Sequence, residues 1–232
     1  MKKLLMISCP ATSRSGYGDH ARDLIRSLIK LDKFDIKILD QRWGDCPQDA
    51  LGKEDLDISS RIALSNTDIP QQPDVWIQIT VPNEFQAIGK FNIGITAGME
   101  TTLVAPEWIE GMNRMDLNIV PSEHSKKVFL DSTYDKIDER TRQKVAQLKM
   151  EKPIEVLFEG LDLSKFFKTN EYTNTVKGFF ENVKEDFCFL ACGHWLKGNF
   201  GHDRKDLGTL IKTFALTFKD TNKAKRPALI LK

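Results

Sequence analysis

Short apolar runs recur along the chain between segments of mixed polar and apolar character. The runs are rich in Val, Ile, Leu and Phe, which is typical of buried β-strands. Strands are predicted at Leu4–Ser8, Phe34–Asp40, Val75–Val81, Phe91–Thr96, Leu117–Val120 and Ile154–Phe158. The run at Val75–Val81 gives the clearest signal, because β-branched residues occupy most of it.

Helical periodicity marks the segments between these strands. Asp19 is expected to cap the first helix, since its carboxylate can accept a hydrogen bond from a free backbone N–H group. The apolar face of this helix would carry Ala21, Leu24, Ile25 and Leu28. Further helices are predicted over Asp49–Ser65, from Pro106 onward, from Ser122 toward Leu130, and over Lys136–Lys152. The last of these is highly charged, so we expect it to be exposed to solvent.

Strands and helices alternate through residues 1–165. This alternation predicts parallel strands that are joined by right-handed crossovers. The expected fold class is therefore α/β, with a Rossmann-like, doubly wound parallel sheet in a first domain that spans residues 1–165. Ligands of such sheets bind at the carboxyl ends of the strands, so the loops there are the first places to look for a site.

Residues 166–232 are expected to hold a crossing segment and a helix, followed by a strand–helix–strand unit. The two strands are predicted at Phe187–Ala191 and Ala228–Leu231, with a helix over Asp206–Thr217 between them. Two parallel strands and one or two helices cannot cover both faces of a sheet. Residues 166–232 are therefore either an appendage that packs on the first domain or the incomplete first β-α-β part of a second Rossmann-like domain. An ending inside a buried strand favours the second alternative.

Composition and charge narrow the function classes. Of the 232 residues, 41% are hydrophobic and 29% are charged, which is typical of a globular protein and excludes overall disorder. The 34 basic and 33 acidic residues leave a net charge of +1, so no nucleic-acid partner is expected. No apolar run is long enough to span a membrane, whereas a peripheral contact with a membrane surface stays open.

The four cysteines are few and irregularly spaced for a chain of this length. A reducing, cytoplasmic location with free thiols is therefore expected. Cys188, Cys192, His194 and His202 form one candidate metal set, but their spacing fits no common zinc pattern. No bound metal is expected.

Gly16, Tyr17 and Gly18 form the first segment with candidate chemistry. They lie between the first predicted strand and the first predicted helix. Backbone N–H groups at a helix N-terminus attract phosphate, and glycine lets a ligand approach the backbone closely. The segment is thus a candidate phosphate site, and the alternative is a plain turn without a ligand.

The same segment also matches a dinucleotide-binding pattern. Gly16-x-Gly18-x-x-Ala21 fits the spacing, and Asp40 lies about where the ribose-binding acid would be. In that pattern the first glycine follows the strand directly, whereas Cys9–Ser15 intervene here. An oxidoreductase that uses an NAD-type cofactor is therefore kept as an alternative function.

Two later segments carry candidate polar groups. Glu100 follows a predicted strand and could accept hydrogen bonds from sugar hydroxyls, or it could be an ordinary surface acid. Arg204 and Lys205 precede a predicted helix and suit a diphosphate, or they could be part of a solvated helix start. His20 is the only histidine near the first glycine segment.

Taken in order, several segments resemble the retaining, nucleotide-sugar-dependent glycosyltransferases of family 4, whose fold of two Rossmann domains is called GT-B. The matching segments are S-G-Y-G at 15–18, G-M-E-T-T at 98–102, P-E-W at 106–108, D-L-N-I-V-P-S at 116–122, V-L-F-E-G-L-D at 156–162 and R-K-D-L at 204–207. The resemblance covers nearly the whole chain. It implies transfer of a sugar from a nucleoside diphosphate sugar to a carbohydrate or other hydroxyl acceptor, with retention.

The resemblance also implies roles for individual residues. Gly16, Tyr17 and Gly18 would approach the donor phosphates, and Glu100 would be the catalytic residue in the cleft near the acceptor. Arg204 and Lys205 would neutralise the diphosphate leaving group, so no metal or other cofactor is implied. The remaining cleft residues on the acceptor side would be His20, Thr101, Ser122 and Gly160.

One departure from the family limits what this chain is expected to do alone. The family's late E-x7-E motif, which binds the donor sugar and the ribose, has no match in residues 166–232, the part of the chain expected to bind the donor. We therefore expect the chain to be truncated within the donor-binding domain and to be a poor catalyst or inactive. A non-catalytic carbohydrate-binding or assembly module is a further alternative.

Overall fold

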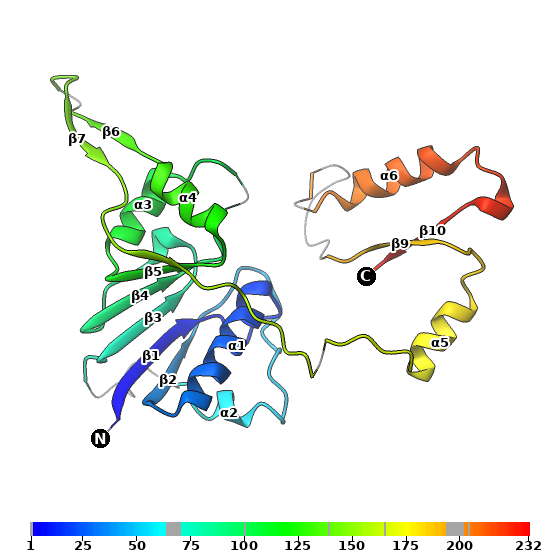
Figure 1. Ribbon diagram of the computed structural model, residues 1–232, viewed down its shortest axis with the longest axis horizontal. Coiled ribbons are helices and arrows are strands. Elements are labelled where there is room, and N and C mark those ends of the chain that lie inside the picture. The colour runs from blue at the N-terminus through cyan, green and yellow to red at the C-terminus, as the bar shows by residue number, and fades with distance from the viewer. Residues whose placement is uncertain are drawn as a thin grey trace. The chain divides into compact units, whose positions relative to one another are not determined.

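The computed structural model describes residues 2–63, 71–99, 101–138, 140–164, 166–193, 202–203 and 205–232 (Figure 1). The chain forms two compact units, Met1–Asp162 and Leu163–Lys232. Within the described residues, no helix combines the length and the apolar character that crossing a bilayer requires.

The first unit is built on a six-stranded sheet with the strand order β2-β1-β3-β4-β5-β8. Its strands are β1 (Lys3–Cys9), β2 (Phe34–Asp40), β3 (Val75–Ile79), β4 (Phe91–Ile95), β5 (Leu117–Val120) and β8 (Ile154–Val156). Every neighbouring pair is parallel. The prediction of an α/β fold with a Rossmann-like parallel sheet is thus confirmed.

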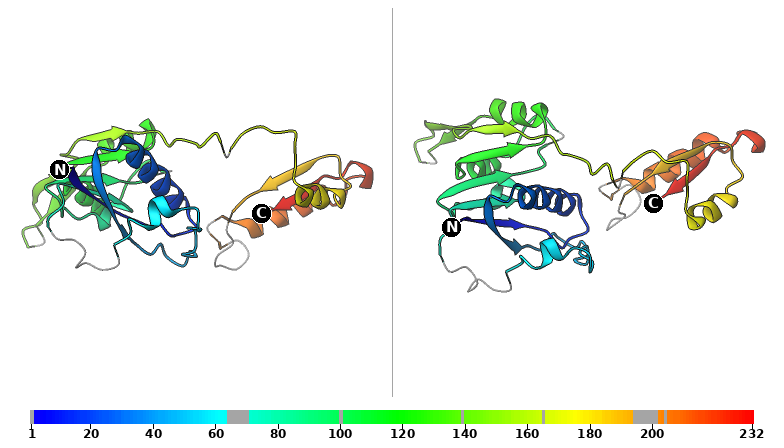
Figure 2. Two further views of the ribbon diagram at one scale, coloured as in Figure 1. Left: turned by 90° about the horizontal axis from the view of Figure 1, so that it is seen from below. Right: turned by 60° about the horizontal axis from the view of Figure 1, so that its bottom comes forward.

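Helices cover both faces of this sheet (Figures 1 and 2). They are α1 (Gly16–Leu31), α2 (Leu56–Ser59), α3 (Pro106–Asn113) and α4 (Glu123–Asp131). Leu5 and Ile7 of β1 pack in one core with α1 and α2, whereas Met6 packs in a second core with α3 and α4. Because successive side chains of a strand point to opposite faces, β1 is buried on both sides and reads as a continuous apolar run.

The winding of the sheet reverses between β1 and β3. From β1 the chain goes first to β2 on one side and then to β3 on the other, and the later strands continue outward from β3. The loops at the carboxyl ends of β1 and β3 therefore leave in opposite directions. This is the position where open α/β sheets bind their ligands.

The predicted helix over Lys136–Lys152 is wrong, because the segment forms an antiparallel hairpin. Its strands are β6 (Tyr134–Ile137) and β7 (Lys144–Leu148), which project from the sheet (Figure 1). The Asp138 carboxylate accepts the backbone N–H groups of Arg140 and Thr141, at 3.0 and 2.6 Å. These bonds close a turn that helical periodicity does not reveal, because an Asp side chain competes with the helix for backbone donors.

The predicted helix over Asp49–Ser65 is also largely wrong. In the described part of this segment, which ends at residue 63, the only α-helix is the single turn α2. Its side chain Ile58 is fully buried in the first core. One apolar anchor is enough to hold a short turn, but it gives no periodic pattern that would support a longer helix.

The second unit contains the predicted strand–helix–strand arrangement. Its elements are α5 (Asn174–Glu181), β9 (Cys188–Ala191), α6 (Leu207–Phe218), the 3-10 turn η3 (Lys223–Lys225) and β10 (Ala228–Leu231). β9 and β10 are parallel. The rings of Phe189 and Phe214 have centroids 6.0 Å apart, and that of Phe218 lies 4.9 Å from Phe214, so α6 packs on one face of this small sheet.

Candidate functional site

The segments that follow β1, β2 and β4 meet at the carboxyl edge of the first sheet. The Tyr17 hydroxyl lies 3.0 Å from the Thr96 hydroxyl and accepts the Ala97 N–H at 3.1 Å. The Tyr17 ring stacks on the ring of Trp43, with centroids 4.2 Å apart and an angle of 29° between the planes. These contacts join the segments after β1, β2 and β4, close to the place between β1 and β3 where the winding of the sheet reverses.

Ser15 begins the first helix, and the prediction that Asp19 caps it is wrong. Ser15 has extended backbone dihedrals, and its Oγ accepts the Gly18 N–H at 3.1 Å. Asp19 instead lies within the first turn. Gly16, Tyr17 and Gly18 therefore form the first turn of α1, where a helix presents donors and the positive end of its dipole.

The two glycines of this turn do different things. A Cβ on Gly18 would lie 2.3 Å from the Ser13 carbonyl oxygen, so only glycine lets the β1–α1 loop approach the helix there. A Cβ on Gly16 would meet nothing within 4 Å, and Gly16 is exposed. Gly18 is thus required by packing, whereas Gly16 leaves the helix N-terminus open to a ligand.

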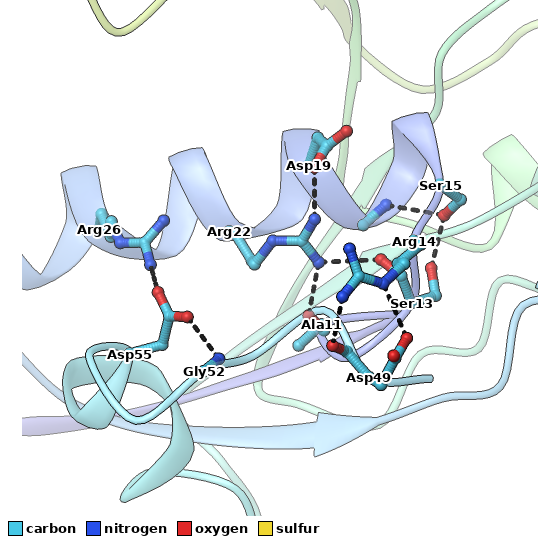
Figure 3. A network of polar contacts seen from close by, with 11 residues as sticks. Ala11, Ser13, Arg14, Ser15, Asp19, Arg22, Arg26, Asp49, Gly52 and Asp55 are labelled. Atoms are coloured by element: carbon cyan, nitrogen blue, oxygen red, sulfur yellow. Dashed lines mark hydrogen bonds and ion pairs between the residues drawn. The ribbon is translucent and has the colours of Figure 1, made fainter. Parts of the chain in front are cut away.

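Arg22 holds the β1–α1 loop from inside (Figure 3). This nearly buried side chain donates to the carbonyl oxygens of Ala11 at 2.8 Å and Ser13 at 2.9 Å, and it forms an ion pair with Asp19. These bonds turn the two loop carbonyl oxygens toward the guanidinium. The two oxygens therefore do not accept hydrogen bonds from the N–H groups of the first helical turn. Arg22 therefore shapes the loop and is not itself free to bind an anion.

Arg14 fixes the outer side of the same loop (Figure 3). Its Nε donates to Asp49 Oδ1 at 2.8 Å. This hydrogen bond lowers the pKa of Asp49, and the positive charge acts in the same direction. The loop after β1 is thereby joined to the segment after β2.

Asp40, the residue expected to bind a ribose in the dinucleotide interpretation, is already engaged. Its two carboxylate oxygens accept the Thr12 N–H at 3.0 Å and the Thr12 hydroxyl at 2.6 Å. The same hydroxyl lies 3.1 Å from Gln48 Oε1. Two acceptor positions of this carboxylate are therefore taken within the protein before any ribose or other ligand binds.

His20 and Gly160 belong to segments that meet at the start of α1. His20 Nδ1 lies 3.5 Å from an oxygen of Glu159, and the His20 side chain is largely buried while that of Glu159 is half exposed. Glu159 and Gly160 follow β8, and Gly160 is exposed with open space around its Cα. A carboxylate beside an imidazole can set the tautomer and the orientation of the ring.

Thr101 and Ser122 lie in neighbouring segments at the start of α4. Ser122 caps this helix as predicted, since its Oγ accepts the Ser125 N–H at 3.1 Å. The Thr101 carbonyl oxygen lies 3.3 Å from Nε2 of His124 in the first turn of α4. Glu100, the predicted catalytic residue, lies outside the described residues.

Gly98 lets the loop after β4 reach this helix. Its φ is +87°, and a Cβ there would lie 2.1 Å from the Ser125 hydroxyl oxygen. Both the dihedral and the close approach require glycine. The glycine of the sequence segment G-M-E-T-T, which contains Glu100, is therefore required by the structure.

In the second unit, Lys205 lies at the carboxyl end of β9. Its Cγ is 3.5 Å from the place where a Cβ would sit on Gly193, which follows β9 by two residues. The Asp203 carboxylate accepts the N–H of Leu207, the first residue of α6, at 3.1 Å. Asp203 is buried, and within the described part of the chain its other oxygen, Oδ1, has no hydrogen-bond partner. Arg204 lies outside the described residues.

The thiol of Cys9 lies at the end of β1 and is a poor candidate for nucleophilic chemistry there. Cys9 is completely buried at the end of β1, and desolvation, followed by the charge of Asp40, raises the pKa of its thiol well above the ordinary value. It therefore stays protonated and is a poor nucleophile. Among the residues that the structure describes, no three His, Cys, Asp or Glu side chains gather in a way that could hold a metal ion.

Two residues at the carboxyl edge of the first sheet, Trp43 and Glu159, were missed by reasoning from the sequence. Trp43 lies three residues beyond the end of β2, so an aromatic residue just past a predicted strand was an available signal. Glu159 meets His20 only because the segment after β8 returns to α1, and no local pattern shows this. No protein-family model and no curated protein matches this chain.

Proposed function

We propose that the chain belongs to a retaining glycosyltransferase of the GT-B type and contributes its acceptor-side domain and the start of its donor-side domain. The observation that carries the proposal is the open first turn of α1. It presents Gly16 beside the reversal of a parallel Rossmann-like sheet, where α/β folds bind phosphorylated ligands. The ordered sequence segments that resemble family 4 extend this from a phosphate site to a nucleotide sugar.

In this proposal, hydrogen bonds from backbone N–H groups at the N-terminus of α1 stabilise the diphosphate of the nucleotide sugar. The dipole of α1 and the N–H groups of its first turn favour the negative charge that develops as the diphosphate leaves. The resemblance to family 4 assigns neutralisation of the leaving diphosphate to Arg204 and Lys205, so the proposal includes no metal ion for this step. The bond between the anomeric carbon and the diphosphate oxygen breaks, and a glycosidic bond forms to the acceptor oxygen with retention. The nucleoside diphosphate leaves with the proton of the acceptor hydroxyl.

On the acceptor side, we assign Glu100 and His20 to the hydroxyl acceptor. Glu100 accepts a hydrogen bond from an acceptor or sugar hydroxyl. His20, which Glu159 holds at 3.5 Å, contributes a second polar group at the start of α1. In this proposal, the remaining residues on the acceptor side are Thr101, Ser122 and Gly160. The protein would act in the cytoplasm, and this role is compatible with a peripheral contact with a membrane surface.

A charge placed at Gly16 tests the phosphate site. In Gly16→Asp the new carboxylate has room, because a Cβ there meets nothing within 4 Å. An acid in the first turn favours the helix by about 0.3–1 kcal/mol, yet it repels a diphosphate. We expect the variant to be as stable as the wild type and to bind nucleoside diphosphates and their sugars at least about tenfold more weakly, as measured by ligand-observed NMR titration.

Gly178→Asp is the matched control, since Gly178 lies on α5 and also has open space around it. It makes the same change of charge and should leave binding unaltered. Equal binding by Gly16→Asp and the wild type would contradict the proposal. Binding of NAD(H) in preference to nucleotide sugars would favour the oxidoreductase, and binding of glycans without any nucleotide affinity would favour a carbohydrate-binding module.

A further inference from the structure

The stacked pair of Tyr17 and Trp43 lies at the ligand edge of the first sheet and is only partly buried. Tyr17 packs against the first core, but neither hydrophobic core of the described residues includes Trp43. An aromatic side chain contributes to folding mainly through the large apolar area that it buries. The placement of Trp43 outside both cores therefore needs another explanation.

The pair is held in a fixed position. The Tyr17 hydroxyl is bonded to Thr96 and to the Ala97 N–H, so the ring cannot rotate away from β4 without breaking both bonds. Trp43 lies in a turn that the Cys46 N–H closes by donating to the Trp43 carbonyl oxygen at 3.1 Å. The next residue, Gly44, has a φ of +50°. A preformed aromatic surface loses little conformational entropy when a ligand stacks on it.

The chain segments that carry this pair also hold polar groups that suit a ligand rich in hydroxyls. Thr12, Asp40 and Gln48, which share one hydrogen-bonded cluster, come from the loop after β1, the end of β2 and the segment after β2. Hydroxyl and amide groups both accept from and donate to sugar hydroxyls, and a carboxylate accepts from them. Of the nearby cations, Arg14 is paired with Asp49, and Arg42, which precedes Trp43, donates its Nε to the Gly44 carbonyl oxygen at 3.2 Å.

We propose that the Tyr17–Trp43 pair binds a sugar ring of the acceptor. The apolar C–H face of the ring stacks on the exposed part of the aromatic pair, and its hydroxyls exchange hydrogen bonds with the polar groups of the neighbouring loops. The assignment of this sugar as the acceptor rests on the proposed glycosyltransferase function, but the binding of a sugar ring at Trp43 does not.

The test uses the full 232-residue chain and simple methyl glycosides of glucose, galactose, mannose and N-acetylglucosamine. Intrinsic tryptophan emission is titrated with each glycoside, and saturation-transfer NMR records which sugar protons contact the protein. We expect a saturable change in emission with at least one glycoside, and transfer to its ring C–H protons. In Trp43→Ala both signals should be lost, or the Kd should rise at least about tenfold.

Trp108→Phe is the matched control. Trp108 packs beside the second core and stacks on Phe129, with centroids 6.3 Å apart, so its replacement leaves the proposed surface intact. Trp43→Phe keeps an aromatic ring and should retain the NMR signal while losing the change in emission. Circular dichroism of each variant shows whether the fold persists.

Three results would overturn the inference: no response to any of the glycosides, a response that Trp43→Ala retains, or stacking at Trp43 of nucleosides alone. These outcomes are separable from those of the Gly16 experiment. Nucleotide-sugar binding without a response at Trp43 would leave the glycosyltransferase proposal standing and remove this surface. Glycoside binding at Trp43 without any nucleotide affinity would support the sugar-binding surface and contradict the glycosyltransferase proposal.

Discussion

The two glycines in the first turn of α1 show how far a residue's role depends on its surroundings. Both fit the same sequence pattern, but only Gly18 faces a backbone oxygen, at 2.3 Å from an added Cβ. We expect Gly18→Ala to lower the free energy of unfolding by about 1–3 kcal/mol, because the β1–α1 loop must move. Gly16→Ala, which meets nothing, should leave stability equal or slightly higher. Urea denaturation of both variants measures this, and equal stability of the two would contradict it.

At the same scale, the sequence located part of the site but not its contacts. It pointed to Gly16, Tyr17, Gly18 and His20 because glycines at a strand–helix junction and a nearby histidine are local features. The partners of Tyr17, which are Trp43 and Thr96, come from distant parts of the chain. Such contacts follow from strand order, which a pattern of apolar and polar residues does not contain.

At the scale of elements, the strands were predicted well and the charged segments badly. Buried parallel strands are covered on both faces and give strong apolar runs, as in β1 and β3. The β6–β7 hairpin lies on the surface, where Ile137 is 48% and Val145 is 64% exposed. A surface ribbon needs few apolar residues, so its pattern resembles that of a solvated helix, and only the turn at Asp138 separates the two.

The N-cap residue of α1, Ser15, should affect the stability of this helix and of the unit that contains it. Ser15 Oγ satisfies the Gly18 N–H, so Ser15→Ala should destabilise the first unit by about 1 kcal/mol and loosen the turn that carries Gly16. Ser27→Ala is the control, because Ser27 lies on the exposed surface of the same helix and its hydroxyl bonds only to the Asp23 carbonyl within that helix. Thermal melts followed by circular dichroism compare them. A loss for Ser27→Ala as large as that for Ser15→Ala would show that the cap is not the cause.

For the whole molecule, alternation of strands and helices was enough to predict the fold class, and the reason is topological. A crossover between parallel strands needs a long connection, which is usually a helix, so strict alternation leaves few other folds. Alternation does not say on which side each new strand is added. The reversal between β1 and β3, which places the candidate site, therefore became visible only in the strand order.

The two units should also differ in stability. The first buries two extensive apolar cores, whereas in the described part of the second unit the buried residues are only Asp203, Leu207, Gly208 and Pro227. Large side chains of the second unit, such as Phe179 at 52% and Leu190 at 65%, remain exposed. Because stability follows buried apolar area, we expect backbone amides of β9 and β10 to exchange with deuterium well before those of β1 and β3.

Hydrogen exchange followed by mass spectrometry measures this order directly on the intact chain. Peptides from α1 serve as an internal reference, since this helix packs on the first core through Ala21 and Ile25. If β9 and β10 were as protected as β1, the second unit would have to bury apolar surface through contacts that its described residues do not make with one another. Slow exchange that appears only at high protein concentration would identify those contacts as intermolecular.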